Sequence, residues 1–246
     1  MPPDNDFSEF ERLRRALHGA DTLLQVQFAM QTFCHFAGVR MLSYFHYPPI
    51  GAADFGPDIP IYAFGFPPQW VEAYRTQGFL QIDPLPRVAA QRTVPFWWSQ
   101  IEELTRLDAA ERGYMRQARQ AGLGDGLAIP VFGPNGRNGY YAAGFDKDAP
   151  RPDESVVSEL HAACQFAHLR FCDLILQSLP ESVTLSQRER QILGYVVRGQ
   201  SNQMIADKLS LSANTVDTYV RRCFDKLDVH DRVTAGLRGL ALGLVA

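Results

Sequence analysis

Apolar residues recur at intervals of three and four throughout the last quarter of the chain. This spacing places them on one side of a helix and predicts a series of helices that each bury one face. The first begins at Ser186, which forms a capping-box sequence with Glu189, and ends at Gly199, a residue suited to a left-handed helix end. Ser201 begins a short second helix, so two helices follow each other closely.

A tight turn leads from the second helix to a third, predicted over Ala213–Leu227, and Asp231 caps a fourth. Two short helices on a tight turn, flanked by two more, are typical of a helix-turn-helix domain. The sequence therefore predicts an all-α, four-helix helix-turn-helix domain over residues 184–246.

The first three quarters of the chain mix helical and strand patterns. Helical spacing and capping residues predict helices over 7–18, 22–37, 67–77, 83–90, 107–121 and 152–176. Strand patterns occur over 40–47, 61–66, 126–132 and 139–145, and a turn sequence at 134–136 predicts a hairpin between the last two. This order predicts an α+β domain over residues 1–176, an α-β-α sandwich around an antiparallel sheet, with residues 177–183 as a linker.

Composition and charge agree with two globular domains. The chain has 246 residues, of which 46% are hydrophobic and 21% charged, values normal for a folded globular protein. Its net charge of −3 is uneven: residues 184–246 carry +3, so the basic excess lies where a polyanion would bind. No apolar run is long enough to span a bilayer and the N-terminus does not resemble a signal peptide, so we expect a cytoplasmic protein.

Neither a metal site nor a catalytic site is expected. The sequence has no glycine-rich phosphate loop, no metal-spaced His/Asp set and no nucleophile with an identifiable base, so we do not expect an enzyme or a cofactor. His161, Cys164, His168 and Cys172 fall within one predicted helix, and one straight helix cannot surround a tetrahedral ion. We interpret these four residues as a helix face or a subunit contact.

Aromatic residues are concentrated around a single acid, Asp83. They are Phe66, Trp70, Tyr74, Phe79, Phe96, Trp97 and Trp98. One interpretation is an aromatic core. The other is a binding site, because a carboxylate among rings needs hydrogen-bond donors and a bound small molecule can supply one.

The residues of the last quarter closely resemble the LuxR-type DNA-binding domain over the whole segment. The matching positions are Leu185, Glu189, Leu193, Gly199, Ser201, Ile205, Ala206, Leu209, Ser212, Thr215, Val216, Lys226, Leu227, Gly243 and Leu244. This resemblance implies binding to double-stranded DNA.

The aromatic segment resembles the autoinducer-binding domain of LuxR-type quorum-sensing regulators. The resemblance rests on Trp70, Tyr74, Asp83, Trp98 and Gly126 and extends over roughly residues 20–175. It implies an N-acyl homoserine lactone or a related signal as effector. Trp70 would donate its indole N–H to the lactone carbonyl and Asp83 would accept the amide N–H, while Tyr74 and Trp98 would line the lactone and acyl chain.

Two positions depart from the family pattern. Phe66 stands where many members have a tyrosine, and Ala142 stands where a hydroxyl residue is frequent. Both changes remove donors that would face the acyl carbonyl. We therefore expect an acyl end poor in donors, which favours an unsubstituted, branched or aromatic acyl group over a 3-oxo chain.

For the DNA-binding domain, the resemblance implies that the exposed face of the third helix enters the major groove. The candidate residues are Asn214, Thr215, Asp217, Thr218, Arg221 and Arg222. Asp217 is unusual because an acid facing phosphates is repelled, and we expect it to pair with Arg221, four residues on. A homodimer on a palindromic promoter site is the implied arrangement.

Two alternatives stay open. The chain could be a receptor of the same architecture, without a partner signal synthase, that senses a different small molecule, an idea that Phe66 and Ala142 support. It could also be a protein-interaction module with vestigial DNA binding, which Asp217 supports.

Overall fold

The computed structural model describes residues 7–52, 54, 61–178 and 183–245. These residues form two compact units, one built mainly from the chain up to residue 175 and the other mainly from the residues that follow. The predicted linker, 177–183, lies largely outside the described residues, and the predicted domain boundaries stay predictions. Among the described residues, none of the helices has both the length and the apolar character needed to cross a bilayer.

A five-stranded antiparallel sheet forms the centre of the first unit, in the order β2-β1-β5-β4-β3. The strands are β1 (Val39–Tyr47), β2 (Ile61–Phe64), β3 (Phe96–Trp97), β4 (Gly126–Phe132) and β5 (Asn138–Phe145). The predicted hairpin joins β4 to β5, and its turn places Asn135 at a φ of 57°. The two-residue strand β3 was not predicted, and it closes the edge of the sheet beside β4.

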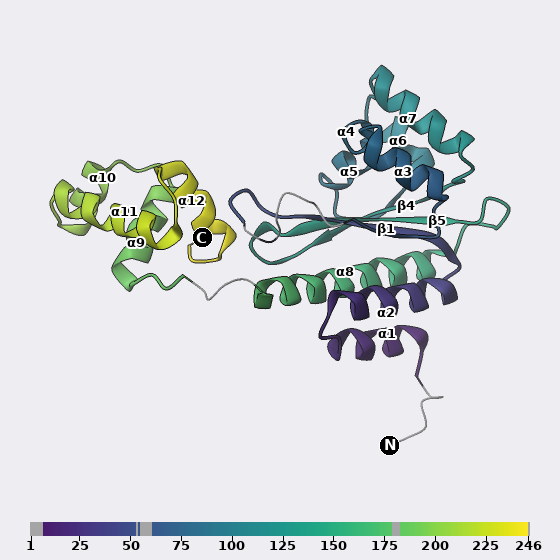
Figure 1. Ribbon diagram of the computed structural model, residues 1–246, viewed down its shortest axis with the longest axis horizontal. Helices are drawn as coiled ribbons and strands as arrows, with labels where there is room; N and C mark the ends of the chain where they lie inside the picture. Colours follow the sequence, from purple (N-terminus) through teal and green to yellow (C-terminus); the bar gives the residue numbers. More distant parts are fainter. Residues whose placement is uncertain (1–6, 53, 55–60, 179–182, 246) are drawn as a thin grey trace. The chain divides into compact units, whose positions relative to one another are not determined.

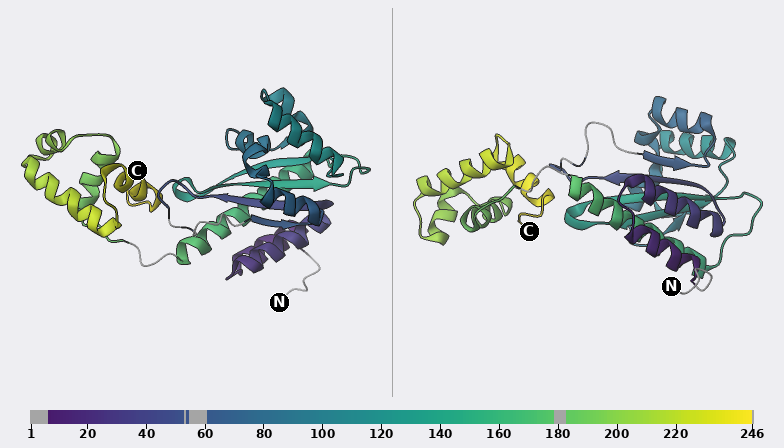
Figure 2. Two further views of the ribbon diagram at one scale, coloured as in Figure 1. Left: turned by 45° about the horizontal axis from the view of Figure 1, so that its top comes forward. Right: turned by 60° about the horizontal axis from the view of Figure 1, so that its bottom comes forward.

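Helices cover both faces of this sheet, so the predicted α-β-α sandwich is confirmed (Figure 1). One face carries α1 (Glu9–His18), α2 (Leu23–Phe36) and α8 (Glu154–Ser178). The other carries α3 (Pro68–Thr76), α4 (Phe79–Ile82), α5 (Pro84–Ala89), α6 (Ile101–Leu104) and α7 (Ala109–Gln120). Figure 2 shows the same layers from two further directions.

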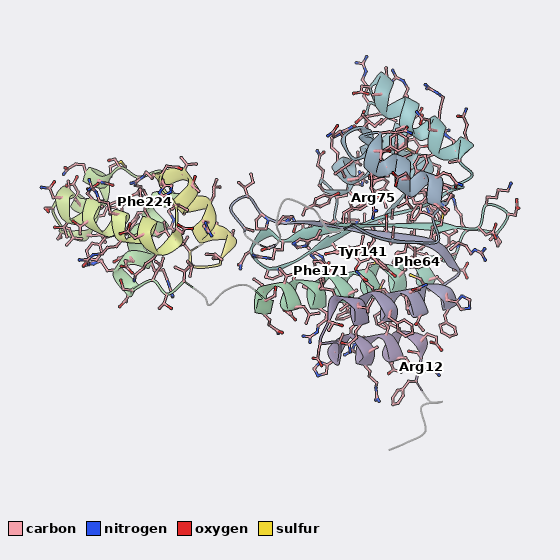
Figure 3. The ribbon with its side chains drawn as sticks, in the orientation of Figure 1. Arg12, Phe64, Arg75, Tyr141, Phe171 and Phe224 are labelled. Carbon is pink, nitrogen blue, oxygen red and sulfur yellow. The ribbon has the colours of Figure 1, made fainter. Side chains whose placement is uncertain are left out.

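Because side chains alternate along a strand, each strand serves both layers. On β1, Tyr44 faces α8, where its ring centroid lies 4.9 Å from that of Phe171. Tyr141 of β5 lies on the same side, with its ring centroid 4.5 Å from that of Tyr44. Figure 3 labels Tyr141 and Phe171. The neighbouring residues Ser43 and Ala142 are paired in register and face the layer of α3 to α7.

The second unit consists of four helices, as predicted. They are α9 (Gln187–Val197), α10 (Asn202–Leu209), α11 (Ala213–Leu227) and α12 (Arg232–Ala241). Ser186 and Glu189 form the predicted capping box, and Gly199 has the expected left-handed φ of 74°. Ser201 and Asp231 cap α10 and α12 through their side chains.

Glu189 also joins α9 to α11. Glu189 is 4% exposed, and its carboxylate accepts hydrogen bonds from the Ser186 backbone N–H and from Lys226 Nζ, both at 2.7 Å. Burial by itself raises the pKa of Glu189, but the hydrogen bonds from Lys226 and Ser186 outweigh it and leave the pKa below its ordinary value. The ionised carboxylate therefore stabilises the helix-turn-helix unit at neutral pH.

We expect Glu189→Gln to lower the free energy of opening α9 and α11 by about 1.5–3 kcal/mol, the range for hydrogen bonds to charged groups. Hydrogen exchange of the backbone amides in these helices at pH 7 measures this. Asp207→Asn is the control, since Asp207 is exposed on α10 and its replacement should change stability by less than about 0.5 kcal/mol. Equal protection in both variants would contradict the assigned role of Glu189.

Candidate functional site

Asp83 occupies a position that the local sequence fixes. It precedes Pro84, which disfavours helical backbone at Asp83, and its φ and ψ of −73° and 114° are extended. Proline then fits the first turn of α5, where its missing N–H costs nothing. The Asp83 side chain caps this helix, with Oδ1 accepting the backbone N–H of Leu85 at 2.9 Å. The helix start therefore orients the carboxylate.

Two tyrosines hold the other carboxylate oxygen. Asp83 Oδ2 accepts the hydroxyl of Tyr74 on α3 at 3.0 Å and that of Tyr114 on α7 at 2.9 Å. Burial raises the pKa of Asp83 to about 6, although the three hydrogen bonds that it accepts lower it in part. Since a carboxylate offers about four acceptor positions, one stays available to a ligand.

Asp83 borders a cavity of about 330 Å³ between the sheet and the layer of α3 to α7. The lining residues include Ser43, Phe45, Ala63, Phe66, Trp70, Tyr74, Asp83, Leu85, Trp98, Tyr114, Tyr140 and Ala142. Trp70 is buried and contacts the rings of Phe79, at a centroid distance of 5.2 Å, and Tyr114, at 5.5 Å. The volume and the mixture of apolar walls with a few polar groups are typical of small-molecule sites.

Six of the seven predicted ligand residues line this cavity: Trp70, Asp83, Tyr74, Trp98, Phe66 and Ala142. Gly126 lies behind the wall. A side chain there would bring its Cβ to 2.6 Å from a carbon of the Trp98 ring, so glycine leaves the space that this ring fills. Tyr74 does more than line the cavity, because its hydroxyl binds Asp83.

The cavity contains hydrogen-bond donors that the sequence analysis did not anticipate, and the expectation of an acyl end poor in donors stays a prediction. Tyr140 lies two residues from Ala142 on the same face of β5, and its buried hydroxyl has no hydrogen-bond partner among the described residues. The same holds for the indole Nε1 of Trp98. Ser43, the cross-strand neighbour of Ala142, also brings a hydroxyl to the lining.

The second candidate surface is the exposed side of α11. Ser210 adopts a left-handed φ of 54° in the turn after α10, and Ser212 caps α11 by accepting the backbone N–H of Thr215 at 3.1 Å. Val216 and Val220 anchor the opposite side of the helix in the core. The predicted residues Asn214, Thr215, Asp217, Thr218, Arg221 and Arg222 all lie outside that buried side.

Charged and aromatic side chains are ordered on this face. Asp217 Oδ2 lies 2.9 Å from Arg221 Nε, which confirms the expected ion pair. The guanidinium of Arg222 lies over the ring of Tyr219 at 5.4 Å, a cation–π contact that the sequence did not predict. The Thr218 hydroxyl donates to the carbonyl of Asn214 at 3.0 Å. Both arginines remain exposed, so a polyanion can reach them.

A buried polar cluster on the other side of the sheet is separate from the cavity. His168 Nε2 donates to the Arg137 carbonyl at 2.9 Å, and Nδ1 accepts the Tyr44 hydroxyl at 2.8 Å. His168, Cys164 and Cys172 are fully buried, so interpreting these three as a subunit contact is wrong. His46, His168 and Cys172 offer metal-ligating atoms within 4.8 Å of one another, but hydrogen bonds already occupy both nitrogens of His168.

Comparison with protein families accounts for both surfaces. The model of the autoinducer binding domain matches residues 23–171, which contain the cavity, and the model of the bacterial regulatory proteins of the luxR family matches residues 183–237. The chain belongs to the LuxR family of transcriptional regulators. It is a quorum-sensing regulator with an autoinducer-binding domain and a LuxR-type helix-turn-helix, and the family consists of regulators and not of enzymes.

Individual LuxR-type proteins agree. The quorum sensing-dependent transcriptional regulator RpaR of Rhodopseudomonas palustris is 28% identical over 183 residues, covering 74% of each chain. The crystal structure of SdiA from Escherichia coli covers 96% of this chain and 98% of its own, with a TM-score of 0.70 at 22% identity. SdiA in complex with octanoyl-rac-glycerol covers 98% and 97%, with a TM-score of 0.70 at 20% identity. At these identities the solved structures establish the fold.

The cavity residues that sequence reasoning missed in this LuxR-type chain include three with hydroxyl groups: Ser43, Tyr114 and Tyr140. Tyr114 is the only aromatic residue in α7 and shares the cavity side with Ala118, one turn on. That spacing was a usable signal. Ser43 and Tyr140 belong to strands whose facing neighbours the sequence does not reveal.

The raised pKa of Asp83 predicts a pH-dependent stability. A carboxyl whose folded pKa of about 6 exceeds the ordinary 3.8 stabilises the fold below pH 3.8, and this contribution is lost as the pH rises through 6. Relative to wild type, Asp83→Asn should therefore gain about 3 kcal/mol between pH 4 and pH 7.5, since one pKa unit equals about 1.4 kcal/mol. Urea unfolding followed by tryptophan fluorescence reports on this unit, because Trp70, Trp97 and Trp98 all lie in it. A difference that does not change with pH would contradict the assignment.

Proposed function

We propose that the effector of this regulator is an N-acyl homoserine lactone, bound in the cavity beside Asp83. The carrying observation is the Asp83 carboxylate, which Tyr74 and Tyr114 orient and which keeps one acceptor position for a ligand. An amide N–H fits that position. The indole N–H of Trp70 is the donor for the lactone carbonyl, since a tryptophan side chain can only donate.

The remaining cavity residues divide between the lactone and the acyl chain. Tyr74 and Trp98 flank the lactone, while Phe66 and Ala142 lie along the acyl chain. Gly126 acts indirectly by making room for the Trp98 ring. In this assignment a hydrophobic chain replaces water against aromatic side chains, which favours binding.

We further propose that the regulator acts in the cytoplasm as a homodimer on a palindromic promoter site. The exposed face of α11 supports major-groove binding, with Arg221 as the residue suited to bidentate contact with guanine. Asp217 holds Arg221 by its Nε, which leaves the terminal nitrogens of the guanidinium for the base. This ion pair removes the main support for a protein-interaction module with vestigial DNA binding.

A second candidate effector is a small molecule without the lactone amide. Phe66 in the lining supports it, because a tyrosine is frequent at that position in the family. The related SdiA has been solved with octanoyl-rac-glycerol, which contains an ester and no amide N–H. A mass spectrum of the compound that copurifies with the full chain distinguishes the two classes.

For the effector site, we expect Asp83→Asn to raise the lactone concentration for half-maximal response at least about tenfold, and Trp70→Phe to raise it in the same direction. Asp83→Asn replaces a charge-assisted hydrogen bond, which contributes about 1.5–3 kcal/mol, and Trp70→Phe removes a neutral one, which contributes about 0.5–1.5 kcal/mol. A promoter-reporter dose–response curve measures this. Trp97→Phe is the control, because Trp97 lies outside the cavity lining and packs under Arg151. Curves that coincide with wild type for both cavity variants would refute the lactone assignment.

For the DNA site, we expect Arg221→Ala to weaken binding to the specific promoter by about 1–3 kcal/mol and to leave binding of the effector unchanged. Arg190→Ala removes the same charge from α9, outside the two helices of the helix-turn-helix, and serves as the control. Gel-shift titrations at matched salt compare the two. Equal losses in both variants would show that Arg221 contributes only its charge.

A further inference from the structure

A continuous series of hydrogen bonds crosses α12, α10 and α11 of the second unit and ends at Arg221 (Figure 1). Arg232, the first residue of α12, donates from Nη1 to Asn202 Oδ1 at 2.9 Å. Asn202, the first residue of α10, donates from Nδ2 to Asp217 Oδ1 at 3.4 Å. Asp217 Oδ2 then accepts from Arg221 Nε at 2.9 Å. We call these four residues the Asn202 network.

The side-chain amide of Asn202 suits the middle of this network. An arginine side chain can only donate hydrogen bonds and an ionised aspartate can only accept them, whereas an amide does both. Arg232 uses the amide oxygen and Asp217 accepts from the amide nitrogen. These two partners also fix which way the amide is turned, because the opposite orientation would place its NH2 group against Arg232 and its oxygen against the carboxylate.

The backbone around Asn202 is held by capping and by α12. Ser201 caps α10 with its side chain, and Arg232 also donates to the carbonyl of Gln200, directly before the cap. Asp231 caps α12 and so sets where the helix that carries Arg232 begins. The start of α10 is therefore tied to the start of α12, and the Asn202 side chain reaches α11 from a fixed position.

Asp217 gains from this second partner. Its side chain is 45% exposed and that of Arg221 is 76% exposed, and an exposed ion pair between residues four apart on a helix contributes little by itself. Asn202 binds the other carboxylate oxygen from a different helix, so Asp217 is restrained from two directions. A carboxylate held in this way can orient the Arg221 guanidinium, which it contacts through Nε.

We propose that Asn202 and Arg232 are positioning residues for base recognition by the helix-turn-helix. They hold Asp217, which in turn orients Arg221, so that this arginine distinguishes bases instead of binding any phosphate within reach. The inference rests on the proposed function, in which Arg221 contacts guanine. It also gives a use to an acid on the DNA-binding face: Asp217 repels phosphates, which weakens non-specific binding, and it improves selectivity.

The test selects binding sites from a pool of random-sequence duplex DNA with the full chain, as purified and with N-octanoyl homoserine lactone added. Wild type should prefer guanine at one position of each half-site by at least about tenfold, and Arg221→Ala should reduce this preference to within about threefold of one. Asn202→Ala should reduce the preference at the same position at least about threefold and leave the other positions unchanged. Added to Arg221→Ala, it should change nothing further, because both act on one contact.

Asn202→Asp tests the same residue with the helix start preserved. An aspartate has the same shape and can still accept from Arg232, but when ionised it has no donor for Asp217. This variant should therefore lose the guanine preference as Asn202→Ala does, even if Asn202→Ala fails to fold.

Asp217→Asn gives a signature that a merely structural role would not produce. Without its negative charge the variant should bind the random pool more tightly than wild type, and yet it should lose the guanine preference. Gln203→Ala is the matched control. It removes an amide from the next position of α10, where Gln203 binds Asp207 on the same helix, and it should keep every wild-type preference.

The proposal is overturned if Asn202→Asp or Asp217→Asn keeps the wild-type guanine preference. It is also overturned if Asn202→Ala weakens binding to all sequences equally, which is the behaviour of a phosphate contact. Failure of the proposed DNA function looks different: wild type enriches no site, or Arg221→Ala keeps the guanine preference, and the inference then falls with it.

Discussion

Burying a carboxylate costs free energy unless donors surround it, and Asp83 meets this condition with groups from three helices. The start of α5 supplies a backbone N–H, α3 supplies the Tyr74 hydroxyl and α7 supplies the Tyr114 hydroxyl. The same three bonds therefore hold the helical layer over the cavity and orient the acceptor that a ligand would use. In the proposed function, ligand binding and folding would both depend on Asp83, so its raised pKa would affect both.

The sheet contributes in a different way. Strict alternation along β1 and β5 sends Tyr44 and Tyr141 into the layer of α8 and sends Ser43, Tyr140 and Ala142 into the cavity. One side of the sheet is thus packed against α8 through Tyr44 and Tyr141, and the other brings small residues as well as the rings of Phe45 and Tyr140 to the cavity. Ala142 has no hydroxyl, but Ser43 on the neighbouring strand is paired with it and brings a hydroxyl to the same cavity.

In the helix-turn-helix unit, too, charged side chains are held by specific partners. Glu189 is buried because Lys226 and the Ser186 backbone satisfy it, and it fixes α9 against α11. On the exposed side of α11, Asp217 holds the guanidinium of Arg221. Asp217, one of the residues predicted to face the groove, therefore forms an ion pair with Arg221, which lies four residues on and so on the same side of the helix.

The sequence by itself determined the elements whose signals are local. The extent of α11, the caps at Ser186 and Ser201, and the Asp83-Pro84 helix start follow from capping chemistry and periodicity, which involve neighbours within four residues. Only the tertiary structure decided which residues meet across the sheet and between layers. Strand register sets Ser43 opposite Ala142, and packing of α7 brings Tyr114 to Asp83 across 31 residues. Such contacts depend on the three-dimensional arrangement of distant segments, and spacing along the chain carries no record of them.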